Sequence, residues 1–128
     1  MRPVVFIYAR SDSQRLPGKA LMPLAGMPLV ALVAARAARV GAQACVLVTT
    51  DRALDDQLAE TGRALGLDVV RGHATDLVAR SLQAIAETKA THFLRVNGDS
   101  PFFAPELAAA AMDHLRHADL VSNLIRRS

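Results

Sequence analysis

The stretch that decides the fold is Val4-Val5-Phe6-Ile7-Tyr8-Ala9-Arg10-Ser11-Asp12-Ser13-Gln14-Arg15-Leu16-Pro17-Gly18-Lys19. It begins with a short apolar run and continues as a polar loop that carries three cationic side chains within ten residues. A strand that is apolar on both faces needs helices on both sides of its sheet. In parallel α/β sheets, ligands bind beyond the carboxyl ends of the strands, which is where such a polar loop would lie.

Short apolar runs alternate with longer helical patterns along the rest of the chain, as expected of βαβ units. Strands are predicted at residues 3–8, 44–49, 68–71, 91–96 and 119–122. Helices are predicted at residues 28–40, 54–65, 75–87 and 105–117, and two of them would stop at Gly41 and Gly66. The predicted fold is therefore a doubly wound α/β layer with a mostly parallel sheet, in a single domain over residues 1–128.

The composition narrows the class of protein. The chain is 52% hydrophobic but only 4% aromatic, which fits a globular core of Ala, Val and Leu. The net charge is +3 with scattered basic residues, so an anionic small molecule explains them better than nucleic acid, for which no aromatic stacking platform is present. The single cysteine, Cys45, excludes a disulfide framework and a zinc site of paired thiols. No membrane span or signal peptide is predicted, so we expect a cytoplasmic protein.

The loop after the first strand has the chemistry of a polyphosphate site. Arg10 and Arg15 can bind phosphate oxygens with forked guanidinium groups, and Lys19 can act as a compact positive charge. Pro17-Gly18 would turn the chain so that Lys19 faces back across the site. The loop matches neither the Walker A motif nor G-x-G-x-x-G. On composition alone, a solvated basic turn remains the alternative.

A second polar loop follows the fourth predicted strand, at residues 97–103. Asp99 lies at its tip after Gly98, where a hard carboxylate oxygen suits Mg²⁺ that is completed by phosphate oxygens and water. The alternative is that Asp99 forms a turn or caps the helix that begins near Pro105. Asp99 is therefore the candidate metal ligand.

The motif Arg10-x-x-Ser13-x-Arg15-Leu16-Pro17-Gly18-Lys19 resembles the signature loop of the cytidylyltransferases that activate acidic sugars. These are the acylneuraminate and CMP-3-deoxy-manno-octulosonate cytidylyltransferases and, most similar, their spore-coat polysaccharide relatives. The turn Pro23-Leu24-Ala25-Gly26-Met27-Pro28-Leu29 and the segments 48–51, 70–72, 76–80 and 95–101 continue the resemblance. Asp12 departs from it, since the spore-coat branch often has Gly there. The resemblance implies a Rossmann-like three-layer nucleotidyltransferase (nucleotide-diphospho-sugar transferase) fold, shortened at the C-terminus.

The resemblance also implies a reaction and a set of site residues. CTP and a sugar acid would give a CMP-sugar and pyrophosphate, for the synthesis of a surface polysaccharide or glycan, with Mg²⁺ as cofactor and Arg10, Arg15 and Lys19 as the catalytic cations. Asp51 and Arg71 sit at strand ends and could face the base or ribose. Arg80 lies on a predicted helix, where an exposed arginine is also a common surface residue. The implied nucleotide-binding residues are Ala9, Arg10, Ser13, Arg15, Lys19, Asp51, Arg71, Arg80 and Asn97, and the implied metal ligand is Asp99.

Length leaves the activity open, because members of this family continue for about as many residues again. One alternative is a shortened nucleotide-binding or subunit-interaction module without catalysis. Another is a nucleotidyltransferase that uses a different nucleoside triphosphate or acceptor, because no residue in the sequence fixes the base. An incomplete sheet would leave an open strand edge or an apolar face, so we expect a homodimer that involves neither nucleic acid nor a membrane.

Overall fold

The computed structural model describes residues 2–11, 18–99 and 104–114 of the chain. Its β-strands are β1 (Pro3–Tyr8), β2 (Pro23–Leu24), β3 (Met27–Pro28), β4 (Ala44–Thr50), β5 (Asp68–Gly72) and β6 (His92–Asn97). Its α-helices are α1 (Leu29–Ala37), α2 (Asp56–Ala64), α3 (Leu77–Thr88) and α4 (Pro105–His114). Short 3₁₀ turns occupy Lys19–Leu21, Ala38–Val40 and Ala53–Asp55. None of these helices is both long and apolar enough to cross a membrane.

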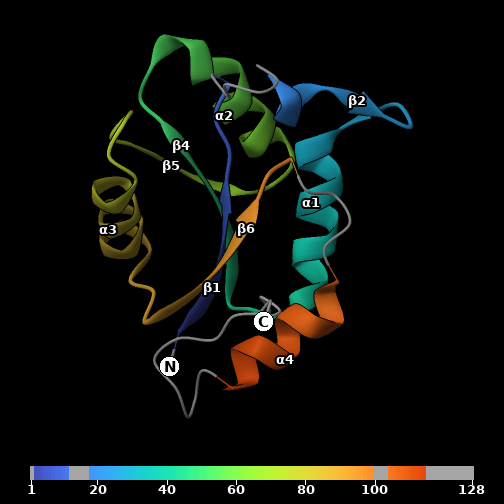
Figure 1. Ribbon diagram of the computed structural model, residues 1–128, viewed down its shortest axis with the longest axis vertical. Helices are drawn as coiled ribbons and strands as arrows, with labels where there is room; N and C mark the ends of the chain where they lie inside the picture. Colours follow the sequence, from blue (N-terminus) through green and yellow to red (C-terminus); the bar gives the residue numbers. More distant parts are fainter. Residues whose placement is uncertain (1, 12–17, 100–103, 115–128) are drawn as a thin grey trace, which may run out of the picture.

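The main sheet has the strand order β5-β4-β1-β6, and all of its pairings are parallel. Parallel neighbours need crossover connections, and α1, α2 and α3 lie in those connections along the chain. Figure 1 shows α3 on one side of the sheet and α1 and α4 on the other. The architecture is a Rossmann-like α/β fold, as the sequence predicted.

The core has two parts, one on each face of the sheet. Val5 and Ile7 of β1 point into a cluster with residues of α1, α2 and α4, whereas Val4 and Phe6 point toward α3. All four side chains are fully buried. This alternation explains why the β1 sequence is apolar without interruption, since both of its faces are covered by helices.

The predicted elements agree with the structure to within a few residues at most bounds. A short antiparallel hairpin, β2–β3, was predicted only as a turn, and it reverses through Ala25 and Gly26 with φ of 54° and 83°. Two-residue loops with positive φ at both positions match the twist of hairpin strands. The predicted strand at 119–122 and the end of the last predicted helix lie outside the described residues.

Candidate functional site

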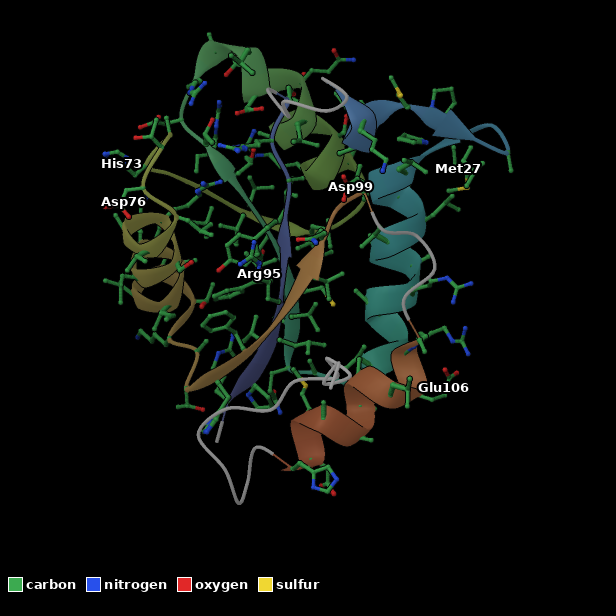
Figure 2. The ribbon with its side chains drawn as sticks, in the orientation of Figure 1. Met27, His73, Asp76, Arg95, Asp99 and Glu106 are labelled. Atoms are coloured by element: carbon green, nitrogen blue, oxygen red, sulfur yellow. The ribbon has the colours of Figure 1, made fainter. Side chains whose placement is uncertain are left out.

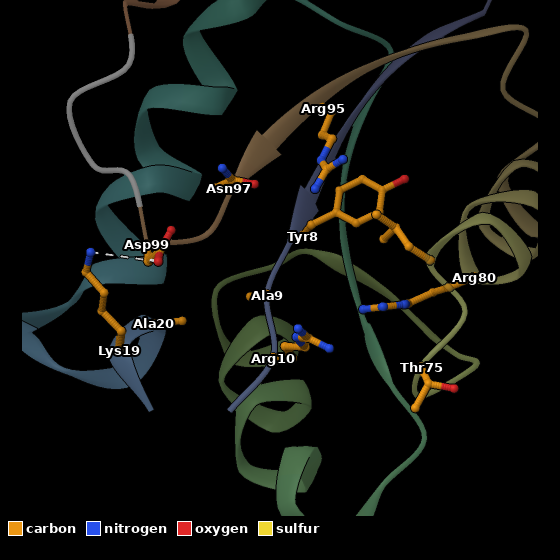
Figure 3. Close-up of a pocket in the computed structure, with 11 residues that line it drawn as sticks. Tyr8, Ala9, Arg10, Lys19, Ala20, Thr75, Arg80, Arg95, Asn97 and Asp99 are labelled. Atoms are coloured by element: carbon orange, nitrogen blue, oxygen red, sulfur yellow. Dashed lines mark ion pairs between the residues drawn. The ribbon is translucent and has the colours of Figure 1, made fainter. Parts of the chain in front are cut away.

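A cavity of about 490 Å³ opens at the carboxyl ends of β1 and β6 (Figure 3). Its size lies within the range of small-molecule sites, and its position is the one expected for ligands of parallel sheets. The lining residues come from both of these strands, from the loops that follow them and from the start of α3. They are Tyr8, Ala9, Arg10, Lys19, Ala20, Thr75, Leu77, Arg80, Arg95, Asn97 and Asp99.

The backbone of the first loop brings two of the predicted cations to this cavity. The Gly18 N–H donates a hydrogen bond to the Ser11 carbonyl over 2.8 Å, so the chain that leaves the sheet at Ser11 returns beside it. Gly18 has a φ of 73°, a conformation that glycine adopts without strain. Arg10 and Lys19 therefore flank the same closed loop. Residues 12–17 lie outside the described part of the chain, and the predictions for Ser13 and Arg15 remain predictions.

Asp99 reaches the cavity because Gly98 packs closely against β1. The Gly98 N–H donates to the Tyr8 carbonyl over 2.8 Å, and a Cβ atom at Gly98 would lie only 2.8 Å from that of Ala9. The Asp99 carboxylate then lies 3.8 Å from Lys19 Nζ, an ion pair whose side chains are 37% and 42% exposed. Such exposed pairs contribute little stability, so both groups are available to a ligand.

The donor set fits a magnesium ion that is bound together with phosphate. Among the described residues, Asp99 is the only carboxylate that lines the cavity, and no three or more of their His, Cys, Asp or Glu side chains form a cluster. Mg²⁺ usually takes one or two carboxylates and completes its octahedron with water and substrate phosphates. Asp99 could therefore hold Mg²⁺ together with the phosphates of a nucleotide.

The face of β6 that is turned toward α3 carries Arg95 and Asn97, two residues apart. The Arg95 guanidinium carbon lies 5.1 Å from the centre of the Tyr8 ring, within the range of a cation–π contact. The Tyr8 hydroxyl lies 2.7 Å from Ser81 Oγ of α3, at hydrogen-bond distance. The sequence prediction included Asn97 but neither Tyr8 nor Arg95. The sequence signal that could have found them is the alternation of side chains along β1 and β6, which puts Tyr8 and Arg95 on the same face of adjacent strands.

Arg80 is only 4% exposed, which corrects the interpretation of this residue as a possible surface arginine of a helix. Its helix comes close to the sheet because Gly72 has no side chain, and a Cβ there would lie 2.9 Å from Arg80 Cγ. The Asp76 side chain caps α3 by accepting from the Ala79 N–H over 3.0 Å. The ring nitrogen Nδ1 of His73 accepts from the Asp76 N–H over 2.9 Å, and Figure 2 shows both residues at the start of α3. Arg80 thus lines the cavity from a well-anchored helix.

Arg71 and Asp51 do not line the cavity. The Arg71 guanidinium donates to the carbonyls of Thr50 and Arg52 over 2.9 and 2.7 Å and pairs with Asp56 at 2.8 Å. These contacts hold the turn after β4 in place. Asp51 is exposed in that same turn. A nucleotide contact by either residue remains a prediction, and in the structure Arg71 also holds this turn.

Asp55 was not predicted, yet it connects the loop after β1 to the end of β4, the neighbouring strand. Its carboxylate is fully buried and accepts hydrogen bonds from the Ser11 N–H, over 2.7 Å, and from the Thr50 hydroxyl. Ser11 directly follows Arg10, so Asp55 fixes the start of the basic loop against the end of β4. Burying a carboxyl group costs free energy unless its oxygens are hydrogen-bonded in this way.

Fold and site together define a Rossmann-like α/β protein in which Arg10, Lys19 and Asp99 line one cavity at the carboxyl ends of two adjacent parallel strands. The family comparison is consistent with this class, because the profile of the cytidylyltransferase family matches residues 4–126. The chain belongs to the cytidylyltransferase family.

Individual relatives agree with this assignment. A 3-deoxy-manno-octulosonate cytidylyltransferase of Tolumonas auensis is 35% identical over 117 residues, which cover 88% of this chain and 44% of that protein. A cytidylyltransferase structure from Leptospira borgpetersenii superposes with a TM-score of 0.86 at 29% identity, covering 91% of this chain and 50% of that one. A CMP-2-keto-3-deoxy-manno-octonic acid synthetase solved with CTP gives a TM-score of 0.78 at 25% identity, covering 91% and 48%. The chain spans about half the length of these relatives.

Proposed function

We propose that this protein binds CTP with Mg²⁺ and transfers the cytidylyl group to a sugar acid. The observation that carries the proposal is the meeting of Arg10, Lys19 and Asp99 at one cavity. Two cations suit a triphosphate, and one carboxylate suits the metal ion that accompanies it. The named activities of the relatives, which act with CTP on 3-deoxy-manno-octulosonate, support the same reaction.

The proposed reaction is a direct displacement at phosphorus. A hydroxyl oxygen of the sugar acid attacks the α-phosphorus of CTP, the bond from that phosphorus to the bridging oxygen breaks, pyrophosphate leaves, and the hydroxyl proton passes to solvent. Arg10 and Lys19 would orient the triphosphate and neutralise charge on the departing pyrophosphate, and we propose that Arg15 adds to this. A magnesium ion held by Asp99 would supply further charge neutralisation. No covalent intermediate with the protein is needed.

Calorimetry and an activity assay with matched variants test this proposal. CTP is titrated with and without Mg²⁺, and pyrophosphate release is then followed with CTP, Mg²⁺ and 3-deoxy-manno-octulosonate. Asp99→Asn and Lys19→Gln should each lower the rate by about 10²- to 10³-fold, as for the loss of one transition-state contact. Asp68→Asn is the carboxylate control, since Asp68 is exposed at the start of β5, at the edge of the sheet opposite the cavity. Lys89→Gln controls for the loss of a lysine.

The outcomes separate the remaining functions. Mg²⁺-dependent CTP binding with pyrophosphate release supports the transferase. Selective CTP binding without turnover supports a nucleotide-binding module instead. A preference for UTP, GTP or ATP would indicate a nucleotidyltransferase with another substrate. If no nucleotide bound, or if Asp68→Asn lowered the rate as much as Asp99→Asn, the proposed site would be wrong.

We also propose that the protein acts as a homodimer. Among the described residues, β6 pairs with β1 on one side only, so its other edge carries unpaired backbone groups. Open edges of this kind are commonly covered by another chain. Light scattering coupled to size-exclusion chromatography measures the mass directly, and a monomer at the concentration of the assay would refute the dimer.

A further inference from the structure

We propose that Arg95 selects the base of the nucleotide by donating two parallel hydrogen bonds to the N3 and O2 atoms of cytosine. The inference rests on the proposed function, since it concerns the same cavity. The Arg95 guanidinium lines the cavity, and it makes neither a hydrogen bond nor an ion pair with any described residue.

Arg95 is nevertheless held in a defined position. Its guanidinium lies over the face of Tyr8, and the Tyr8 hydroxyl is anchored at Ser81 Oγ over 2.7 Å. Tyr8 is 8% exposed and is further packed edge-on against Phe6, with ring centres 6.3 Å apart. A guanidinium fixed on its face by an aromatic ring keeps its N–H groups pointing outward along its edge. These forked donors are thus arranged for a ligand with two neighbouring acceptors in one plane.

The position of Arg95 favours the base over the phosphates. Figure 3 shows the Lys19–Asp99 pair at one end of the cavity and Arg95, Tyr8 and Arg80 toward the other. Arg95 and Asn97 are separated by about 6.6 Å along β6 on the basis of ordinary strand geometry, and Asp99 lies further on. A triphosphate held at the Lys19–Asp99 end would leave the Arg95 end of the cavity for the base.

The walls around Arg95 suit a flat heterocycle. The ring of Tyr8 and the side chain of Leu77 line this end of the cavity together with Thr75. Apolar and aromatic walls with a few directed polar groups are typical of pockets for such ligands. A phosphate group, by contrast, would be better placed beside Lys19 at the other end.

The chemistry of the two pyrimidines gives Arg95 a means of discrimination. Cytosine presents N3 and O2 as adjacent acceptors, and both accept from one guanidinium. Uracil carries a hydrogen on N3, so one N–H of Arg95 would face another donor. A well-formed bidentate contact of arginine with a base edge discriminates by about tenfold to a hundredfold.

Calorimetric titration of CTP, UTP and tripolyphosphate, with Mg²⁺, tests this inference on four forms of the chain. These are the wild type, Arg95→Gln, Arg95→Lys and the control Arg63→Gln, which removes an exposed arginine of α2. The wild type and the control should prefer CTP over UTP by at least about tenfold. Both Arg95 variants should lose most of this preference through weaker CTP binding, while tripolyphosphate binds as before. Arg95→Lys distinguishes forked geometry from charge, because it keeps the charge alone.

Three results would overturn the inference. Equal losses for CTP, UTP and tripolyphosphate would make Arg95 a phosphate contact. An unchanged preference for CTP in Arg95→Gln would place the base elsewhere, and it would do so while leaving the proposed function intact. If the wild type bound no nucleotide, both proposals would fail. Because Arg95 is exposed, its substitution should not unfold the protein, and melting curves of the variants check this.

Discussion

Replacing Asp55 by alanine should be the most damaging single change at a polar residue of this protein. The side chain is fully buried and accepts hydrogen bonds from the Ser11 N–H and the Thr50 hydroxyl. Hydrogen bonds to a charged group contribute about 1.5–3 kcal/mol each, and the variant would also leave the buried Thr50 hydroxyl and the partly buried Ser11 N–H without this acceptor. We therefore expect the free energy of unfolding to fall by about 3–5 kcal/mol, a large share of the roughly 5–15 kcal/mol that stabilises a domain.

Urea denaturation followed by circular dichroism measures this loss, with Asp68→Ala as the control for removing a carboxylate. Asp68 is exposed, so its substitution should change the stability by less than about 0.5 kcal/mol. Thr50→Val tests the mechanism, because it removes one of the two donors and keeps the shape. The double variant should then lose less than the sum of the two single losses. A loss below about 1 kcal/mol for Asp55→Ala, or strict additivity with Thr50→Val, would refute the reasoning.

Three further predictions concern two glycines, the cysteine and the tyrosine. Gly98→Ala should weaken CTP binding, because its Cβ would push the Asp99 loop away from β1. Gly62→Ala, where a Cβ would lie 2.6 Å from Leu47 Cδ2, should instead lower the stability and leave the affinity for CTP unchanged. Calorimetry measures the affinity and urea denaturation the stability. Burial raises the pKa of the Cys45 thiol, so less thiolate forms at a given pH and a thiol reagent at pH 8 should react more slowly with the folded than with the urea-unfolded protein. Tyr8 is the only tyrosine and the chain has no tryptophan, so its emission reports on the cavity that it lines. CTP should change this emission, once corrected for absorption of light by the base, because the proposed base site lies beside Tyr8. Tripolyphosphate should leave the emission nearly unchanged.

The sequence predicted the fold well because the relevant signals are local. The apolar run of β1, the glycine stops after the helices and the alternation of short and long patterns each depend on neighbouring residues. The hairpin β2–β3 was predicted only as a turn because strands of two residues carry no alternation. The predicted closing of the first loop toward the site was also local, since Pro17-Gly18 marks a turn in the sequence itself.

The site was predicted less completely because several of its contacts join distant segments. Asp55 bonds to Ser11 across 44 residues, and no periodicity indicates that pairing. The burial of Arg80 depends on the missing side chain of Gly72, on a different element. Arg71 has the residue type of an anion ligand, but the carbonyls of the turn after β4 engage its guanidinium. For Arg80 and Arg71 residue type suggested the chemistry, and in all three cases only the packing decided what the side chain contacts.

The parallel pairing of β1 with β6 is what makes one cavity out of two loops. Its register places Tyr8 opposite Asn97, so the residues that follow, Ala9 and Gly98, leave the sheet side by side. Arg10 and Lys19 of the first loop and Asp99 of the second therefore line one cavity because the two strands end side by side. The start of the first loop is fixed separately, by Asp55 at the end of β4. Loss of Asp55 should consequently lower the affinity for CTP even at temperatures where the variant is fully folded, because it frees the backbone next to Arg10 while the β1–β6 pairing persists.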